Sequence, residues 1–342
     1  MRGLRIRSFG GDLVDEEVAD PVCGPDEVLV RVEACSVGMT VLNCIRGDLG
    51  HDPAHLPLVP GHELVGTVQA VGAGVDDAVR GQRVAAYFYL FCGTCDRCLA
   101  GAEDLCRNLK GYLGVDRDGG YAEMVAIPAR NAVRLPDDLD PILATVIPDA
   151  VATPVHIARR AQIAPGQKVV VVGAGGGVGI HMVQVARAFG AEVAALDVSP
   201  AKLRVLSDEL ECAAFDSSDL GSIKGFESWL RGAKPDLVID FIGNPTTLTW
   251  SVAALGTGGK LVTLTTFLNV DFPLSPREVV LRELSVLGSR YASRYELHLA
   301  AQMVVDGKVR PMIGRREGPD GVPAIHRDLA SGQLLGRGAL VW

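Results

Sequence analysis

The segment 168–196 constrains the fold of this chain more than any other. It opens on an unbroken valine run, Val169–Val172, which is typical of a strand buried on both faces of a sheet. Glycines crowd positions 173–179, a helical apolar pattern follows, and a second strand is predicted over Glu192–Leu196. A strand, a glycine-rich turn, a helix and a strand in this order predict a βαβ unit.

The same alternation continues beyond this unit. Strands are predicted over 235–243, 259–266 and 285–290, and helices over 246–255 and 275–284. Repeated strand–helix units predict a parallel sheet with helices on both faces, which is a doubly wound α/β fold.

The glycine turn has the chemistry of a phosphate cradle, because a helix N-terminus offers unpaired N–H groups and positive dipole charge. Gly176 would let phosphates approach the backbone, and Gly179 would let helix and strand pack closely. The strict pattern G-x-G-x-x-G is broken at Ala174. The flanking strand and helix still favour dinucleotide binding, as does the acid Asp197 at the tip of the next strand. The expected cofactor contacts are Gly175, Gly176, Gly177, Val178, Gly179 and Ile242.

Asp197 favours NAD over NADP. Its carboxylate would accept hydrogen bonds from the adenosine ribose diol, and its charge would repel a 2′-phosphate. The same side chain could cap the helix that begins at Ser199-Pro200, and the two roles are compatible. Lys202 is predicted either to reach the same ribose or to be an exposed helix lysine.

Four of the eight cysteines lie together in the pattern C-x2-C-x2-C-x7-C. The N-terminal stretch MRGLRIRSFGGD has no apolar run after its arginines, so we expect no secretory signal, and metal ligation is favoured over disulfides. Four thiolates close a tetrahedral zinc shell, so the zinc would be structural. A redox pair and an iron–sulfur cluster are the competing interpretations. The predicted ligands are Cys92, Cys95, Cys98 and Cys106.

Charge and hydropathy exclude other classes of protein. The formal net charge is −8, which argues against nucleic acid as a main partner. The cleanest apolar run, 169–180, is shorter than the roughly 20 residues of a membrane helix. We therefore expect a cytoplasmic protein with a small-molecule partner and about two domains.

Several further segments, together with the cysteine cluster and the glycine loop, resemble the zinc-containing medium-chain alcohol dehydrogenase family. They include GPDEVLVRVEACSVG, VPGHELVGTV, GGYAEMVAI and the C-terminal GQLLGRGALVW. The resemblance covers essentially the whole chain. It implies a β-rich GroES-like catalytic domain over 1–152 and 291–342, with the zinc lobe at 92–106, and a Rossmann domain over 153–290.

The resemblance also implies an active site between the two domains. The family holds a catalytic zinc, and the G-H-E motif carries over to His62, with Glu63 as the neighbour that exchanges with water at the metal. The phrase I-P-D, followed by a threonine, places Asp149 as a ligand and Thr153 near the nicotinamide. A homodimer or homotetramer is expected, paired through the strand at 284–289.

Two other residues are implied by the same resemblance. Thr40 would relay the proton of the alcohol outward. Arg337 in the GRGALVW tail would lie near the pyrophosphate, where its positive charge is suited. The aromatic residues at 87–91 would either pack in the core or shape the substrate pocket.

The cysteine that usually completes the catalytic zinc site does not carry over. Thr40 and Gly47 match family positions and fix a register in which Gly38 stands where the ligand cysteine should be. Cys35 lies too early in this register and Cys44 too late. The family's outer histidine is Asn43 here, and an amide cannot exchange a proton near neutral pH.

Three functional hypotheses remain. In the first, zinc stays on His62, Glu63 and Asp149, and the protein is an NAD-dependent alcohol dehydrogenase (EC 1.1.1.-) that interconverts an alcohol and an aldehyde or ketone. Two carboxylates side by side in a closed cleft call for a cation, which favours this hypothesis. In the second, the enzyme reduces an activated C=C or C=O without catalytic zinc, with His62 or Thr40 as proton donor. In the third, the protein binds NAD without turnover.

Overall fold

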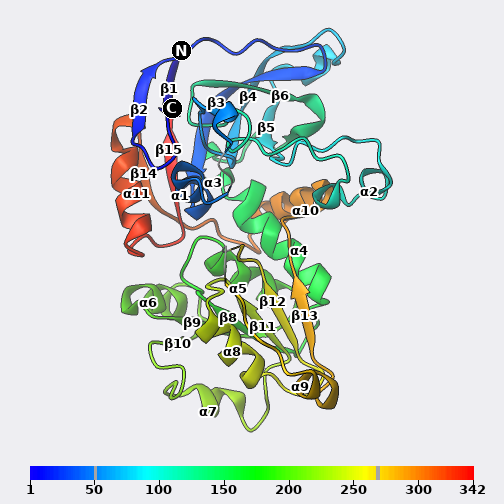
Figure 1. Cartoon of the computed structure of the whole chain (residues 1–342), viewed down its shortest axis with the longest axis vertical. Coiled ribbons are helices and arrows are strands. Elements are labelled where there is room, and N and C mark those ends of the chain that lie inside the picture. Colours follow the sequence, from blue (N-terminus) through cyan, green and yellow to red (C-terminus); the bar gives the residue numbers. More distant parts are fainter. Residues whose placement is uncertain (50–51, 267–269) are drawn as a thin grey trace. The chain divides into compact units, whose positions relative to one another are not determined.

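The valine run predicted as a buried strand forms β8 (Lys168–Val172), which is buried along its whole length. In the computed structural model, which describes residues 1–49, 52–266 and 270–342, β8 lies inside a six-stranded sheet ordered β10-β9-β8-β11-β12-β13 (Figure 1). Every neighbouring pair in this sheet is parallel. The predicted doubly wound parallel sheet is therefore confirmed.

The elements of this sheet follow the predicted alternation. The strands predicted over 235–243, 259–266 and 285–290 and the helix predicted over 275–284 are shorter in the structure. The sequence pattern did not place α4, β10 and α7, and it gave only the start of α6, at Ser199-Pro200. The strands are β8, β9 (Glu192–Asp197), β10 (Ala213–Asp216), β11 (Leu237–Asp240), β12 (Lys260–Thr263) and β13 (Ser285–Gly288). The helices are α4 (Ala152–Ala161), α5 (Gly179–Ala188), α6 (Pro200–Asp208), α7 (Phe226–Leu230), α8 (Pro245–Ala254) and α9 (Pro276–Leu281).

The described residues divide into two compact units. Unit 1 comprises Met1–Ala152, Ala292–Val305 and Pro311–Trp342, and unit 2 comprises Thr153–Tyr291 and Asp306–Arg310. The last segment lies outside the predicted Rossmann range. It joins unit 2 because the backbone N–H of Arg310 donates to Gln184 Oε1 at 2.7 Å and its carbonyl accepts from Gln184 Nε2 at 3.1 Å.

Unit 1 is built on a mostly antiparallel sheet ordered β14-β15-β3-β4-β5-β7, with β6 also paired to β3. The strands of this sheet are β3 (Glu27–Val37), β4 (Leu64–Val71), β5 (Arg83–Ala86), β6 (Met124–Pro128), β7 (Ala132–Arg134), β14 (Ile313–Glu317) and β15 (Arg337–Val341). A separate two-stranded sheet of the same unit pairs β1 (Arg2–Ile6) with β2 (Leu13–Glu17). The helices of unit 1 are α1 (Met39–Arg46), α2 (Asp96–Leu99), α3 (Pro141–Ala144), α10 (Arg294–Val305) and α11 (Val322–Ala330), with a π-helical turn at Ile147–Val151 and short 3-10 turns between elements.

The sheet of unit 1 places three distant parts of the sequence side by side. The end of β3 lies between the start of β4 and the start of β15. Cys35 pairs with Leu64 of β4, and Val37 pairs with Gly338 of β15. By continuing these antiparallel registers, Gly38 comes to lie between the G-H-E motif and Arg337.

One helical stretch, Pro141–Ala161, is 21 residues long and apolar enough to pass a test for a membrane span, with a mean hydropathy of 1.3. The segment contains no long uncharged apolar run, because Asp149 interrupts its apolar residues. In the structure 72% of its apolar window is buried inside the protein, which is the environment of a core helix.

Candidate functional site

The structure gathers three of the predicted site residues in unit 1. Ligand atoms of His62, Glu63 and Asp149 all lie within 4.8 Å of one another. His62 Nε2 is 3.4 Å from Asp149 Oδ2, and Glu63 Oε1 accepts a hydrogen bond from the Ala150 N–H at 3.1 Å. We call these three residues the acid–histidine cluster.

Local backbone features set the positions of these side chains. Gly61 has φ +98°, and a Cβ there would lie 2.5 Å from the Tyr121 ring, so only glycine fits before His62. Asp149 lies in the π-helical turn Ile147–Val151, in which the Val151 N–H bonds to the carbonyl of Val146. Pro148 lacks an N–H, which favours such a bulge, and bulges of this kind are frequent at functional sites.

Arg337 joins the cluster, which the sequence pattern did not predict. Its Nη2 lies 3.1 Å from Glu63 Oε2 and 3.2 Å from Asp149 Oδ2. The guanidinium side chain is 6% exposed, Glu63 is fully buried and Asp149 is 14% exposed. Burial raises the pKa of Glu63, Arg337 opposes this rise and Asp149 adds to it.

The guanidinium also fills the space beside Gly38. A Cβ built on Gly38 would come within 2.6 Å of Arg337 Cζ, and nearer still to Nη1. Gly38 is buried and offers no donor atom at the position where the family carries a cysteine ligand.

These contacts bear on whether a divalent cation fits. An imidazole and two carboxylates are ligand types that zinc accepts, and Glu63 Oε2 makes no well-aligned hydrogen bond. However, both carboxylates already pair with a guanidinium, which a dication on the same oxygens would face at short range. The catalytic zinc of the family therefore finds the right donor types but not the right surroundings.

The two cysteines nearest in sequence are not alternative ligands in this structure. Cys35 is fully buried, and its Sγ packs where side chains at Gly61 and Gly120 would lie. Burial raises the pKa of its thiol well above the usual value, which disfavours the thiolate that a metal needs. The Cys44 thiol contacts the carbonyl of Gly114 at 3.5 Å, and burial raises its pKa to about 11.

The remaining predicted residues near the reaction lie as follows. Thr40 is half-buried at the second position of α1, two residues beyond Gly38. Thr153, in unit 2, is buried in the first turn of α4. Phe88 packs edge-on against the His62 ring with centroids 4.6 Å apart, whereas Tyr87 is a core residue whose hydroxyl donates to the Ala292 carbonyl.

The four clustered cysteines lie together in unit 1 with all sulfur atoms within 4.8 Å of one another. The Cys92–Cys98, Cys95–Cys98 and Cys95–Cys106 sulfur pairs are 3.9, 3.5 and 4.0 Å apart. A tetrahedron with zinc–sulfur bonds of 2.3 Å has edges of about 3.8 Å, so the cluster fits one zinc ion. A hydrogen bond from the Thr94 backbone N–H to the Cys92 sulfur is the largest cause that lowers the pKa of Cys92 to about 5, which favours its thiolate.

The glycine loop of unit 2 has the geometry of a phosphate cradle. Gly173, at φ +77°, makes the turn after β8. In the motif register this turn belongs to the first glycine position, which Ala174 holds. A Cβ at Gly179 would lie 2.9 Å from Ala174 Cα, so helix and strand pack closely there. A Cβ at Gly176 would meet only the Gly173 carbonyl, at 3.3 Å, so this side of the loop is open. Ile242 lies against Gly173.

Asp197 lies beside this loop at the end of β9. Its Oδ2 accepts from the Gly175 N–H at 2.8 Å, and its Oδ1 accepts from the Ser199 N–H at 3.0 Å. The second bond closes a turn just before α6. The N-cap of α6 is Ser199, with no side-chain capping bond, so Asp197 does not have the capping role considered from the sequence. Lys202 is buried against Gly175 rather than exposed, and burial lowers its pKa while Asp197 opposes the shift.

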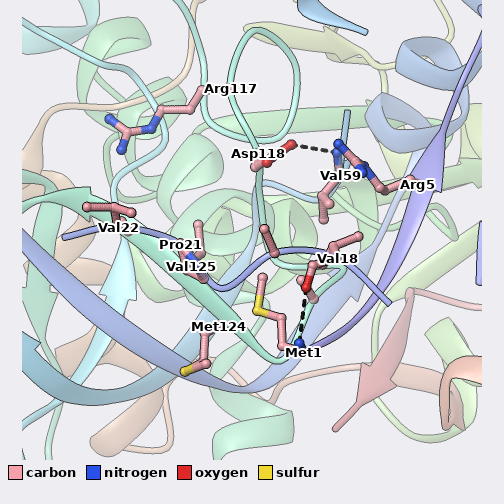
Figure 2. Close-up of a pocket in the computed structure, with 13 residues that line it drawn as sticks. Met1, Arg5, Val18, Pro21, Val22, Val59, Arg117, Asp118, Met124 and Val125 are labelled. Atoms are coloured by element: carbon pink, nitrogen blue, oxygen red, sulfur yellow. Dashed lines mark hydrogen bonds between the residues drawn. The ribbon is translucent and has the colours of Figure 1, made fainter. Parts of the chain in front are cut away.

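A separate cavity of about 300 Å³ lies in unit 1 (Figure 2). Its charged groups pair within the unit: the Met1 ammonium with Asp20 at 3.0 Å, and Arg117 with Glu27 at 2.7 Å. Asp118 Oδ1 accepts from the Val59 N–H. None of the predicted site residues lines this cavity, and we assign it no function.

Two sequence profiles of known protein families match the chain. The sequence profile described as alcohol dehydrogenase GroES-like domain matches residues 24–137, and the profile described as zinc-binding dehydrogenase matches residues 177–306. An alcohol dehydrogenase of Geobacillus stearothermophilus is 32% identical over 339 residues, which are 98% of each chain. The chain belongs to the zinc-type medium-chain alcohol dehydrogenase family.

Other proteins that resemble the chain include a reductase and a further alcohol dehydrogenase. An acryloyl-coenzyme A reductase of Sulfurisphaera tokodaii is 31% identical over 303 residues, which are 87% of each chain. The solved structure of a thermostable alcohol dehydrogenase from Pyrobaculum aerophilum has a TM-score of 0.90 and 29% identity, and the match covers 100% of this chain and 99% of that one. The protein is thus an alcohol dehydrogenase-like, NAD(P)-dependent oxidoreductase of small molecules.

Proposed function

We propose that the protein is an NAD-dependent reductase of a carbonyl group or of a C=C bond conjugated to one, acting without catalytic zinc. One observation carries this proposal. The two carboxylates that a second zinc would use are paired with the Arg337 guanidinium at 3.1 and 3.2 Å, and Gly38 supplies no thiolate. This is the second of the three hypotheses drawn from the sequence.

The cofactor preference follows from unit 2. The open side of Gly176 and the first turn of α5 suit a pyrophosphate, and the Asp197 carboxylate suits an unphosphorylated adenosine ribose. When bound, NADH supplies the hydride. The negative charge of Asp197 is the reason to propose NAD rather than NADP.

The remaining chemistry belongs to groups of unit 1. Reduction adds a hydride to carbon and one proton to the carbonyl oxygen, or to the α-carbon of a conjugated double bond. His62, whose Nε2 lies 3.4 Å from Asp149 Oδ2, is the first candidate proton donor. The Thr40 hydroxyl is the second candidate donor. Phe88 beside the His62 ring would present an apolar wall to the substrate.

A zinc-assisted alcohol dehydrogenase is the second candidate function. The mutual distances within the acid–histidine cluster favour it, and so does Glu63 Oε2, which lacks a well-aligned hydrogen bond. The alcohol dehydrogenase name of the Geobacillus relative points the same way.

The test is a substrate screen with metal counting. Purified protein is assayed with NADH on aldehydes, ketones, enones and α,β-unsaturated thioesters, before and after exposure to a chelator that leaves the four-cysteine zinc in place. We expect turnover with one zinc per chain and no loss after chelation. We also expect Thr40→Val or His62→Gln to lower kcat by roughly 10²–10⁴-fold.

Other outcomes identify the alternatives. Turnover that requires a second zinc, and that favours alcohols with NAD+, would support the zinc-assisted enzyme. NAD binding with no turnover on any substrate would support the non-catalytic protein.

A further inference from the structure

Gly38 is a glycine for a reason other than its backbone. Its φ of −131° and ψ of 176° are extended values that any residue adopts, so conformation does not require glycine here. Space does, because a Cβ at this position would fall on the guanidinium of Arg337. Residue 38 must therefore be glycine as long as the Arg337 guanidinium occupies this position.

The sheet register enforces this proximity. Gly338 pairs with Val37 across the β15–β3 ladder. Arg337, which precedes Gly338, therefore lies opposite Gly38, which follows Val37. The backbone N–H of Arg337 donates to the Met312 carbonyl at 3.0 Å, which holds the start of β15 in place. The side chain is 6% exposed, so it cannot turn into solvent without rearranging its surroundings.

The charges of the site complete the argument. Glu63 is fully buried beside Asp149, and two neighbouring carboxylates need a cation. Arg337 Nη2 lies within 3.2 Å of an oxygen of each, so the guanidinium supplies a permanent positive charge at this point. A divalent cation on the same oxygens would meet this charge at close range with little solvent to screen it.

We infer that Arg337 takes the place of a metal ion. Its guanidinium occupies the space that a side chain at position 38 would need, and it excludes divalent cations from a latent site formed by His62, Glu63 and Asp149. The site would accept a borderline divalent cation such as Zn²⁺ or Co²⁺ once the guanidinium is removed. This inference rests on the metal-free part of the proposed function, but its tests use metal binding and stability rather than turnover.

The first test counts metal. The full-length protein is loaded with Zn²⁺, desalted and analysed for zinc per chain, and Co²⁺ binding is followed by its visible absorption. The wild type should hold one zinc, in the four-cysteine lobe. Arg337→Ala should bind a second equivalent on the order of 100-fold more tightly than the wild type, and Gly38→Cys/Arg337→Ala should bind it with cobalt–thiolate absorption. Arg316→Ala, which removes an exposed arginine from the adjacent strand β14, should behave as the wild type.

The second test measures the coupling between residues 38 and 337 and needs no metal. Gly38→Ala should lower the Tm by about 5 °C in the wild-type background and by much less in the Arg337→Ala background. Gly318→Ala is the matched control, because a Cβ there meets open space and its φ is −73°. It should leave the Tm within about 1 °C of the wild type.

Two results would overturn the inference. One is a second zinc bound by the wild type with an affinity that Arg337→Ala leaves unchanged. The other is an equal effect of Gly38→Ala in both backgrounds. A protein that turns nothing over but passes both tests refutes the proposed function alone. A reductase that works without a second zinc, but in which Gly38→Ala has the same effect in both backgrounds, refutes this inference alone.

Discussion

Arg337 lies directly across the β3–β15 ladder from Gly38, and its guanidinium takes the volume that a side chain at position 38 would need. The same guanidinium pairs with Glu63 and Asp149. One side chain thus occupies the space of the missing ligand residue and also supplies the positive charge that the two carboxylates need. Four further consequences of the structure can be tested.

The four-cysteine lobe should carry one zinc that stabilises the fold. Cys95→Ser should remove that zinc and lower the Tm by about 5 °C or more, because structural metal binding contributes directly to folding free energy. Cys23→Ser is the matched control, since Cys23 lies outside the lobe and its thiol contacts backbone groups of Gly24, Glu27 and Leu29. Elemental analysis and thermal unfolding measure both effects, and an unchanged zinc content in Cys95→Ser would contradict the assignment.

Asp197 should set the preference for NAD. Asp197→Asn keeps oxygen and nitrogen near the Gly175 and Ser199 N–H groups but removes the charge that would repel a 2′-phosphate. The variant should bind NADP+ at least about tenfold more tightly than the wild type and NAD+ somewhat less tightly. Calorimetric titration with each cofactor decides this, and an unchanged ratio of the two dissociation constants would be evidence against the role.

His326 should make unit 1 sensitive to acid. Its Nε2 lies 3.1 Å from the Tyr121 hydroxyl, and burial lowers its pKa to about 4. A histidine with a lowered folded-state pKa contributes stability that is present above its unfolded pKa of about 6.5 and is lost as the pH falls towards 4. The maximum loss is about 3 kcal/mol.

The matching variant is His326→Gln, which can still hydrogen-bond to Tyr121 but does not acquire a charge. Between pH 7 and pH 4 the wild type should lose up to about 3 kcal/mol of unfolding free energy relative to this variant. Urea denaturation at a series of pH values gives the difference. Parallel pH profiles for the two proteins would show that His326 is not responsible.

The edge of the parallel sheet should mediate self-association, as the family resemblance implies. Strand β13 ends the sheet of unit 2 among the described residues, and Val286 on it is 40% exposed. Val286→Lys should shift the protein towards smaller species in light scattering after gel filtration. Val280→Lys, on the exposed face of α9, is the control, and equal masses for the wild type and Val286→Lys would exclude this edge.

Much of the fold was readable in the sequence because its signals are local. The valine run of β8, the glycine loop and the helix after it are neighbours along the chain, so their patterns survive without knowledge of tertiary contacts. The spacing of the four cysteines likewise predicts a metal site within one short segment, and the structure brings the four sulfur atoms together. Motif matching also aligned Gly38 with the family's cysteine position and selected His62, Glu63 and Asp149, which the structure brings together.

Other features had no local signal. The turn after β8 depends on the positive φ of Gly173 rather than on the alanine that interrupts the motif. Lys202 is buried, although a lysine in a helix is usually exposed. The long apolar helix 141–161 could be recognised as a core helix only from its burial.

The sequence by itself determined the architecture, the cysteine site and the absence of a ligand side chain at position 38. Through the family resemblance it also predicted two carboxylates near His62 that would need a cation, since charge must be balanced wherever solvent is excluded. Only the tertiary structure identified that cation as Arg337. The pairing of β15 with β3 brings the C-terminal strand to the G-H-E motif, and a strand register between distant segments is fixed by packing and hydrogen bonds that no local pattern records.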